Sequence, residues 1–236
     1  MKDLARLAQS MFGISLSNGQ LNTLQKYENE LLVWNSRYNL TAIQEPEKIR
    51  IKHFLDSLTC LIIMREKPFE RIIDVGTGAG FPGIPIKIAC PQIRLTLVES
   101  VGKKADFCRH IVKSLAMEGV EVVQERAETV GQLPQYREQF DWVVARAVAA
   151  LPTLVEYLLP LAHIGGGIIA MKGESAPAEA HAADRGIHLL GGRLRRLAPI
   201  TLPGVVDERY LVVIEKIAAT PAQYPRHIGI PGKRPL

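Results

Sequence analysis

Residues 72–83 read IIDVGTGAGFPG, a short apolar run followed by four glycines within eight residues. The run Ile72 to Val75 predicts a strand, and Gly83 to Ala89 predicts the helix that follows it. Glycine suits the turn between them because it adopts positive φ values and lets the backbone approach a ligand closely. The stretch therefore predicts the first strand–loop–helix unit of a nucleoside-binding α/β sheet.

Short apolar runs and longer amphipathic segments alternate downstream of this loop. The runs predict strands at Arg94–Val98, Val120–Val123, Phe140–Ala145 and Gly167–Met171, with helices at Lys103–Met117 and from Pro152. This alternation indicates right-handed crossovers and a mostly parallel sheet. Near the end, Leu194–Leu202 and Arg209–Lys216 flank Pro203-Gly204 and predict a final antiparallel pair. The fold class is therefore a doubly wound α/β sheet whose last strand is antiparallel.

The first seventy residues carry helical signals instead. Ser17-x-x-Gln20 is a capping-box start, and Leu21, Leu24, Tyr27, Leu31 and Trp34 recur at helical spacing. Pro46 stands at a first-turn position of a second helix that runs towards Met64. We divide the chain into a helical extension (1–68), an α/β domain (69–219) and a basic tail (220–236).

Composition places the chain among ordinary globular proteins. It has 236 residues, of which 47% are hydrophobic and 22% charged, which excludes a disordered or collagen-like chain. The longest uncharged stretch, Tyr157–Met171, is broken by Pro160 and three glycines, so no membrane span is expected. Three cysteines without a CxxC pair predict neither a metal site nor a disulfide framework, and the start lacks a secretory segment. We expect a cytoplasmic protein.

The net charge of +5 fits a polyanionic partner, and its placement is informative. After Glu215 the chain has no acidic residue, yet it holds Lys216, Arg226, Lys233 and Arg234. A basic tail rich in Pro and Gly is typical of an extended arm on nucleic acid, or of a merely solvated end.

Two cofactors compete for the glycine loop. The string Gly78-x-Gly80-x-x-Gly83 matches the pattern for a nicotinamide dinucleotide, whereas acid-x-Gly-x-Gly-x-Gly from Asp74 matches that for S-adenosylmethionine. Glu99 ends the second predicted strand, where a carboxylate accepts both ribose hydroxyls. That acid serves either cofactor, so it indicates a nucleoside without choosing between them.

Several short motifs occur in an order that is specific when taken together. They are Asn39-Leu40-Thr41, His53 with Asp56-Ser57-Leu58, residues 74–85, Glu99-Ser100, Gly102-Lys103-Lys104, Arg126-Ala127-Glu128, Arg146-Ala147, Lys172-Gly173 and the ending 224–236. In this order the chain resembles, over nearly its whole length, the bacterial small-subunit ribosomal RNA guanine-N7 methyltransferases, also called glucose-inhibited division protein B.

The resemblance implies a class I methyltransferase fold that uses S-adenosylmethionine to methylate N7 of a guanine in 16S ribosomal RNA, free or in the small ribosomal subunit. It implies Gly76 and Phe81 on the cofactor, Ala127 and Glu128 around the adenine, and Arg146 between cofactor and RNA as the candidate catalytic residue. The full set of expected cofactor residues is Asp74, Gly76, Gly78, Gly80, Phe81, Glu99, Ser100, Ala127, Glu128 and Arg146. One departure is Ala145, where the family often has Ser.

The motifs that are missing agree with N7 chemistry. Methylation at a pyrimidine C5 needs a cysteine nucleophile in a strand-end loop, and no cysteine of this chain falls in one. Exocyclic amines often need an Asn/Asp-Pro-Pro-aromatic loop, where this chain has Ala145-Arg146-Ala147. The N7 lone pair is free at neutral pH, so proximity and orientation suffice. We assign no general base, and we assign Arg146 an orienting role.

Two other functions stay open at this point, a dinucleotide-dependent oxidoreductase and a nonenzymatic RNA-binding assembly factor on a methyltransferase scaffold. His53, Asp56 and Ser57 share one predicted helix face. These three residue types are those of a Ser-His-Asp catalytic triad. However, side chains on one helix face cannot readily form the hydrogen-bonded series of nucleophile, base and orienting acid that a triad needs. A structural or cofactor-edge role is favoured for them.

Overall fold

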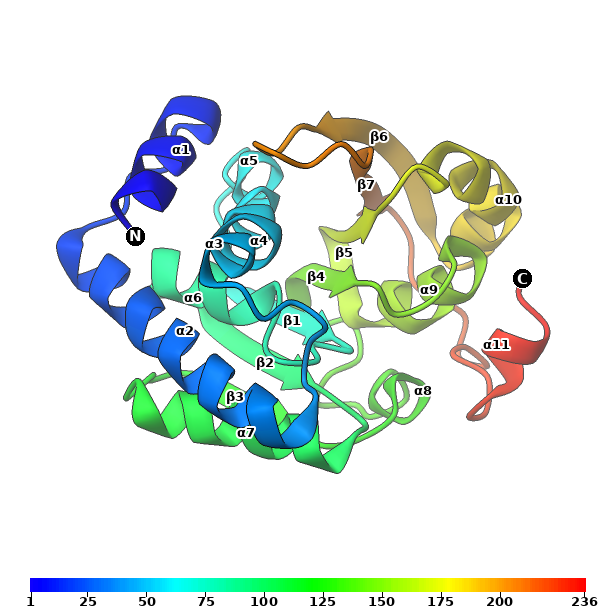
Figure 1. Cartoon of the computed structure of the whole chain (residues 1–236). Coiled ribbons are helices and arrows are strands. Elements are labelled where there is room, and N and C mark those ends of the chain that lie inside the picture. The colour runs from blue at the N-terminus through cyan, green and yellow to red at the C-terminus, as the bar shows by residue number, and fades with distance from the viewer.

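Seven strands form one sheet in the computed structural model, which describes all 236 residues (Figure 1). The strands are β1 (Arg71–Val75), β2 (Arg94–Val98), β3 (Val120–Val123), β4 (Phe140–Arg146), β5 (Ala162–Lys172), β6 (Gly192–Ile200) and β7 (Arg209–Lys216). Their order is β3-β2-β1-β4-β5-β7-β6. The first five strands pair in parallel, and β7 runs antiparallel to both β5 and β6. The predicted sheet with its antiparallel last strand is confirmed.

The sheet is buried on both faces, which explains the nearly continuous apolar character of its strands. Adjacent residues of one strand belong to different cores, because successive side chains point to opposite faces. Ile72 lies in a core of 35 buried residues, and Ile73 lies in a second core of 23.

The first core is shared with the N-terminal helices. These are α1 (Lys2–Phe12), α2 (Asn18–Tyr38), α3 (Pro46–Ile49), the π-helical turn η1 (Arg50–Leu55), α4 (Asp56–Leu58) and α5 (Cys60–Met64). The capping box at Ser17 and Gln20 forms as predicted. The Gln20 amide also donates to the carbonyls of Ile88 and Ala89, so this cap joins α2 to the end of the helix Gly83–Ala89 that follows β1.

The remaining helices complete the two layers around the sheet. They are α6 (Gly83–Ala89), α7 (Gly102–Ser114), α8 (Ala127–Val130), α9 (Leu151–Leu158), η2 (Leu159–Leu161), α10 (Ala176–Leu189) and α11 (Ile230–Lys233). None of the helices combines the length and apolar character that a bilayer crossing requires.

The tail is neither extended nor merely solvated, so that prediction is wrong. Residues 220–236 run back across α8 and α9, and their end lies near α10 (Figure 1). Part of the reason is electrostatic, because one of the three cations of the tail, Arg226, pairs with the fully buried Glu156. Lys216, at the end of β7 just before the tail, pairs with Glu138.

Candidate functional site

The glycine loop between β1 and α6 is organised from beneath by Asp74, which is fully buried. Its Oδ2 accepts hydrogen bonds from the Thr77 hydroxyl at 2.6 Å and from the Gly83 N–H at 2.8 Å. Its Oδ1 is buried without a hydrogen-bond partner, and burial raises the pKa of Asp74 to about 6. In this structure Asp74 braces the loop.

Two glycines of the loop are required by close approach as well as by backbone conformation. Gly76 has φ +69°, and a Cβ there would lie 2.6 Å from Cγ2 of Val148 on the β4–α9 loop. Gly80 has φ +94°, and a Cβ there would lie 2.7 Å from the Tyr27 hydroxyl. That hydroxyl donates to the Ala79 carbonyl, so α2 holds the loop from outside the sheet.

Glu99 stands directly after β2 and is almost fully buried. Its Oε2 accepts from the Gly78 N–H at 2.9 Å, and its Oε1 accepts from the Val101 N–H at 2.8 Å. Each carboxylate oxygen has a second lone pair. Glu99 thus fixes the loop and keeps acceptor capacity for a ligand hydroxyl.

A cavity of about 480 Å³, which we call the first cavity, opens at the carboxyl ends of β1, β2 and β4. Ligands of doubly wound sheets bind at this edge, and the volume suits a nucleoside cofactor. Four residues expected at the cofactor line it, namely Gly76, Ser100, Ala127 and Glu128. Gly76 and Val148 both line the cavity, and only glycine avoids a clash with Val148 there, so the loop backbone is left bare beside the cavity, as a nucleoside held against the loop requires.

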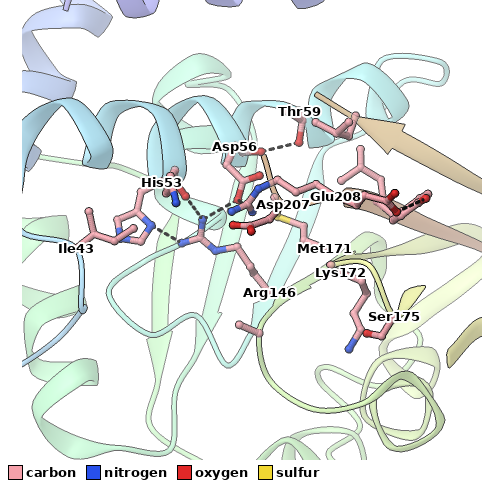
Figure 2. A pocket seen from close by; sticks show the side chains of 17 residues that line it. Ile43, His53, Asp56, Thr59, Arg146, Met171, Lys172, Ser175, Asp207 and Glu208 are labelled. Atoms are coloured by element: carbon pink, nitrogen blue, oxygen red, sulfur yellow. Dashed lines mark hydrogen bonds and ion pairs between the residues drawn. The ribbon is translucent and has the colours of Figure 1, made fainter. Parts of the chain in front are cut away.

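The second cavity, of about 430 Å³, lies between the extension and strands β4, β5 and β7 (Figure 2). Arg146 projects from the end of β4 into a set of acceptors on η1 and α4. One guanidinium nitrogen donates to Asp56 Oδ2 and to the Lys52 carbonyl, each at 3.1 Å, and the other lies 3.1 Å from His53 Nδ1. Residues about ninety positions apart therefore form one cluster.

The Asp56 carboxylate forms ion pairs with two arginines, Arg146 and Arg209. Arg209, at the start of β7, donates to the same Oδ2 at 3.3 Å, so one almost fully buried carboxylate joins the extension to β4 and β7. The Arg209 Nε is buried without a hydrogen-bond partner. A buried unpaired donor costs free energy, so the Arg209 side chain is held here without full hydrogen-bond satisfaction.

His53 is neutral in this cluster. Burial, with the Arg146 charge beside it, lowers the pKa of His53 to about 3. The unprotonated Nδ1 accepts from Arg146, and Nε2 donates to the Thr41 hydroxyl at 2.8 Å. The Phe81 ring stacks on His53 at 4.5 Å and lies 5.0 Å from the Arg146 guanidinium carbon.

The expected site residues therefore fall into three groups. Gly76, Ser100, Ala127 and Glu128 line the first cavity, Arg146 lines the second, and Phe81 supports Arg146 from beneath. The others, Asp74, Gly78, Gly80 and Glu99, shape the loop itself.

Sequence reasoning missed Arg209 of the second cavity and Tyr157 of the first. It also left His53 and Asp56 without a partner. No local pattern marks these residues, because their partners are distant in the chain. No group of three His, Cys, Asp or Glu side chains is placed to hold a metal ion.

Solved structures of methyltransferases share this fold. Precorrin-6y C5,15-methyltransferase of Geobacter metallireducens superposes with a TM-score of 0.54 at 16% identity, covering 76% of this chain and 91% of that one. A SAM-dependent methyltransferase of Aquifex aeolicus gives 0.53 at 14% identity, covering 74% and 96%. The fold is that of a class I S-adenosylmethionine-dependent methyltransferase.

Some proteins share much more of this chain's sequence than these structural neighbours do. The chain is 51% identical over 236 residues to ribosomal RNA small subunit methyltransferase G of Roseiflexus castenholzii, covering all of both chains. It is 43% identical to the protein of the same name in Alkaliphilus oremlandii, covering 100% of this chain and 99% of that one. A family model described as rRNA small subunit methyltransferase G matches residues 20–201. The chain belongs to the rRNA small subunit methyltransferase G family.

Proposed function

We propose that the protein transfers a methyl group from S-adenosylmethionine to N7 of a guanine in 16S ribosomal RNA. Membership of the family supports the cofactor and the RNA. The observation that carries the proposal is the loop after β4. Arg146 and Ala147 line the second cavity, while the next three residues, 148–150, line the first. A single short loop thus separates a place for the cofactor from a place for the target base.

The first cavity takes the nucleoside end of the cofactor in this proposal. Gly76 lets the chain approach it, Ser100 in the lining and the adjacent Glu99 are assigned to the ribose, and Ala127 and Glu128 are assigned to the adenine. The bound cofactor supplies an electrophilic methyl group on its sulfonium. The residues of the cavity have only to hold that group at the β4 loop.

The second cavity takes the guanine. Its N7 lone pair needs no deprotonation, so the task of the cavity is to hold the base within about 3 Å of the methyl group and in line with it. Arg146 is suited to orient the base because three acceptors and the Phe81 ring fix its guanidinium. Arg209 lines the same cavity with a partly exposed side chain, so its guanidinium is a further donor for the guanine O6.

The ionisable groups of the cluster agree with a reaction that needs no general base. His53, with its pKa near 3 and both ring nitrogens hydrogen-bonded, is a poor proton acceptor. Burial raises the pKa of the Cys60 and Cys108 thiols, so neither is a thiolate nucleophile at neutral pH. Neither the oxidoreductase nor the nonenzymatic factor gains support from the family or from this chemistry.

Labelled-methyl transfer tests the proposal. Small ribosomal subunits and free 16S RNA from cells that lack the protein are incubated with it and with labelled S-adenosylmethionine, and the modified base is mapped. We expect one labelled guanine that carries the methyl at N7. Label on another atom, or cofactor binding without any transfer, would contradict the proposal, and the latter would favour the assembly factor.

Arg146→Lys tests the orienting role. Lysine keeps the charge but cannot contact Asp56, Lys52 and His53 at once, so we expect single-turnover methylation to fall by about a hundredfold. Affinity for S-adenosylhomocysteine stays within about threefold because Arg146 lines the other cavity. The matched control is Arg185→Lys on the exposed face of α10. Full methylation by Arg146→Lys would remove Arg146 from the proposed site.

A further inference from the structure

The C-terminal strap, residues 220–236, forms part of the wall of the first cavity. Gly232 and Pro235 line that cavity together with Gly76 and Glu128, which lie more than a hundred residues earlier in the chain. We infer that the strap is a structural part of the cofactor site, and that Arg226, paired with Glu156, is a positioning residue for cofactor binding. The inference rests on the proposed function, since it takes the first cavity as the cofactor's.

The distal half of the strap is tied to residues that line the cavity. The Gly229 N–H donates to Glu128 Oε1 at 2.9 Å, and Glu128 is the acid assigned to the adenine. The Thr153 hydroxyl donates to the Pro231 carbonyl at 3.3 Å. A shift of residues 229–235 would therefore move a wall of the cavity and release the carboxylate of Glu128.

One buried ion pair fixes this half of the strap. The Glu156 carboxylate is fully buried on α9 and accepts from the Arg226 backbone N–H at 2.8 Å, from its Nε at 2.9 Å and from its Nη2 at 2.6 Å. The same Nη2 donates to the Arg234 carbonyl at 2.7 Å. Arg226 thus holds both ends of the α11 segment, and such forked, charge-assisted bonds are the strong and directional kind.

The proximal half has anchors of its own. Arg137 donates to the carbonyls of Thr220, Pro221 and Tyr224, and Gln132 donates to the Pro225 carbonyl. These bonds do not involve Arg226. Loss of the Arg226 side chain therefore loosens residues 226–236 while residues 220–225 stay in place.

Affinity for S-adenosylhomocysteine, measured by calorimetry on the full chain, tests the inference. Arg226→Gln removes the fork on Glu156, and we expect its dissociation constant to rise roughly tenfold or more. Lys233→Gln is the matched control, because Lys233 lies on the same strap, is exposed and makes no ion pair. We expect that variant to bind within about twofold of the wild type, since it loses only a solvated charge.

A second variant covers the possibility that the unpaired Glu156 unfolds Arg226→Gln. A chain that ends at Ile228 keeps the Arg226–Glu156 pair and removes only the segment that lines the cavity and contacts Glu128. We expect the same loss of affinity from it. Trypsin supplies an independent measure, because S-adenosylhomocysteine should slow cleavage after Arg226 and Lys233 in the wild type.

The outcomes separate the two claims. Wild-type affinity in both Arg226→Gln and the shortened chain would overturn the inference and leave the proposed function standing. An equal loss in Lys233→Gln would also overturn it, because charge rather than position would then matter. If the wild-type chain binds no S-adenosylhomocysteine, the proposed function fails and the inference fails with it.

Discussion

Glu99 shows how one carboxylate serves a loop and a ligand at once. One carboxylate oxygen accepts the Gly78 N–H and the other accepts the Val101 N–H. Each oxygen has a second lone pair that can accept from a ligand. We predict that Glu99→Ala loses about 2–4 kcal/mol of cofactor binding, or roughly thirtyfold to a thousandfold in affinity. Calorimetric titration with S-adenosylhomocysteine measures the loss, with the exposed Glu47→Ala as control. Unchanged affinity would mean that Glu99 serves the loop alone.

Burial of His53 makes the free energy of unfolding fall as the pH falls below neutrality. The pKa of His53 falls from 6.5 in the unfolded chain to about 3 in the fold, so the unfolded state binds the extra proton between these values. The stability that neutral His53 contributes is complete above pH 6.5 and is lost as the pH falls towards 3.

At pH 5 this loss amounts to about 2 kcal/mol relative to pH 7. The glutamine of His53→Gln does not titrate. Between pH 7 and pH 5 the free energy of unfolding of this variant should therefore fall by about 2 kcal/mol less than that of the wild type. Urea unfolding at pH 7 and pH 5 measures both chains, and the exposed His181→Gln is the control. Parallel pH dependences for wild type and His53→Gln would show that His53 is not held neutral.

At the scale of elements, α2 reaches the glycine loop through one hydroxyl. Tyr27 is fully buried, and its O–H donates to the Ala79 carbonyl between two positive-φ glycines. Tyr27→Phe leaves that carbonyl buried and unpaired, which costs about 1–3 kcal/mol of stability. We expect weaker S-adenosylhomocysteine binding as well, by several-fold, because the loop loses its outer support.

Thermal unfolding and calorimetric titration check this prediction. Tyr38→Phe is the matched control, because Tyr38 ends the same helix and is 42% exposed. Equal effects of the two substitutions would argue against any special contact between α2 and the loop.

Elements with large apolar side chains could be predicted from the sequence, and those built from small ones could not. The helix Gly83–Ala89 and the strands Arg94–Val98 and Arg209–Lys216 have the predicted bounds. Helix α10 was missed because its buried face consists mainly of Ala176, Ala180, Ala183 and Gly186. Such residues carry little hydrophobic periodicity, although they let α10 approach α9 closely.

The site divides in the same way between local and distant contacts. The residues that form the glycine loop could be predicted from the sequence, because Asp74 and the glycines are close together in the chain and Glu99 ends the adjacent strand. The Arg146–Asp56–Arg209 cluster spans more than 150 residues, and a single sequence holds no record of that pairing. Arg226 could be read as a tail cation, but its partner Glu156 could not be identified before the fold was known.

At the scale of the whole molecule, the extension and the α/β part share one core. Fifteen of the 35 buried residues in the first core, from Leu4 to Met64, come from the extension. Asp56 adds ion pairs to β4 and β7 from the same side. The boundary near residue 68 is therefore a change of pattern along the chain, and we expect one cooperative unit across it.

This shared core predicts that residues 69–236 do not fold alone. Removing the extension would expose side chains of the α/β part that share the first core, among them Ile84, Phe107 and Leu211. Each large apolar side chain contributes about 1.5–3 kcal/mol when buried, so exposure of several of them is comparable with the roughly 5–15 kcal/mol stability of a typical protein. We expect the full chain to unfold in one transition, with coincident near-ultraviolet and far-ultraviolet circular dichroism. The shortened chain should lack the near-ultraviolet signal and a cooperative melt. A cooperative melt of residues 69–236 would establish the α/β part as an independent domain, and the extension would then be an accessory to a fold complete without it.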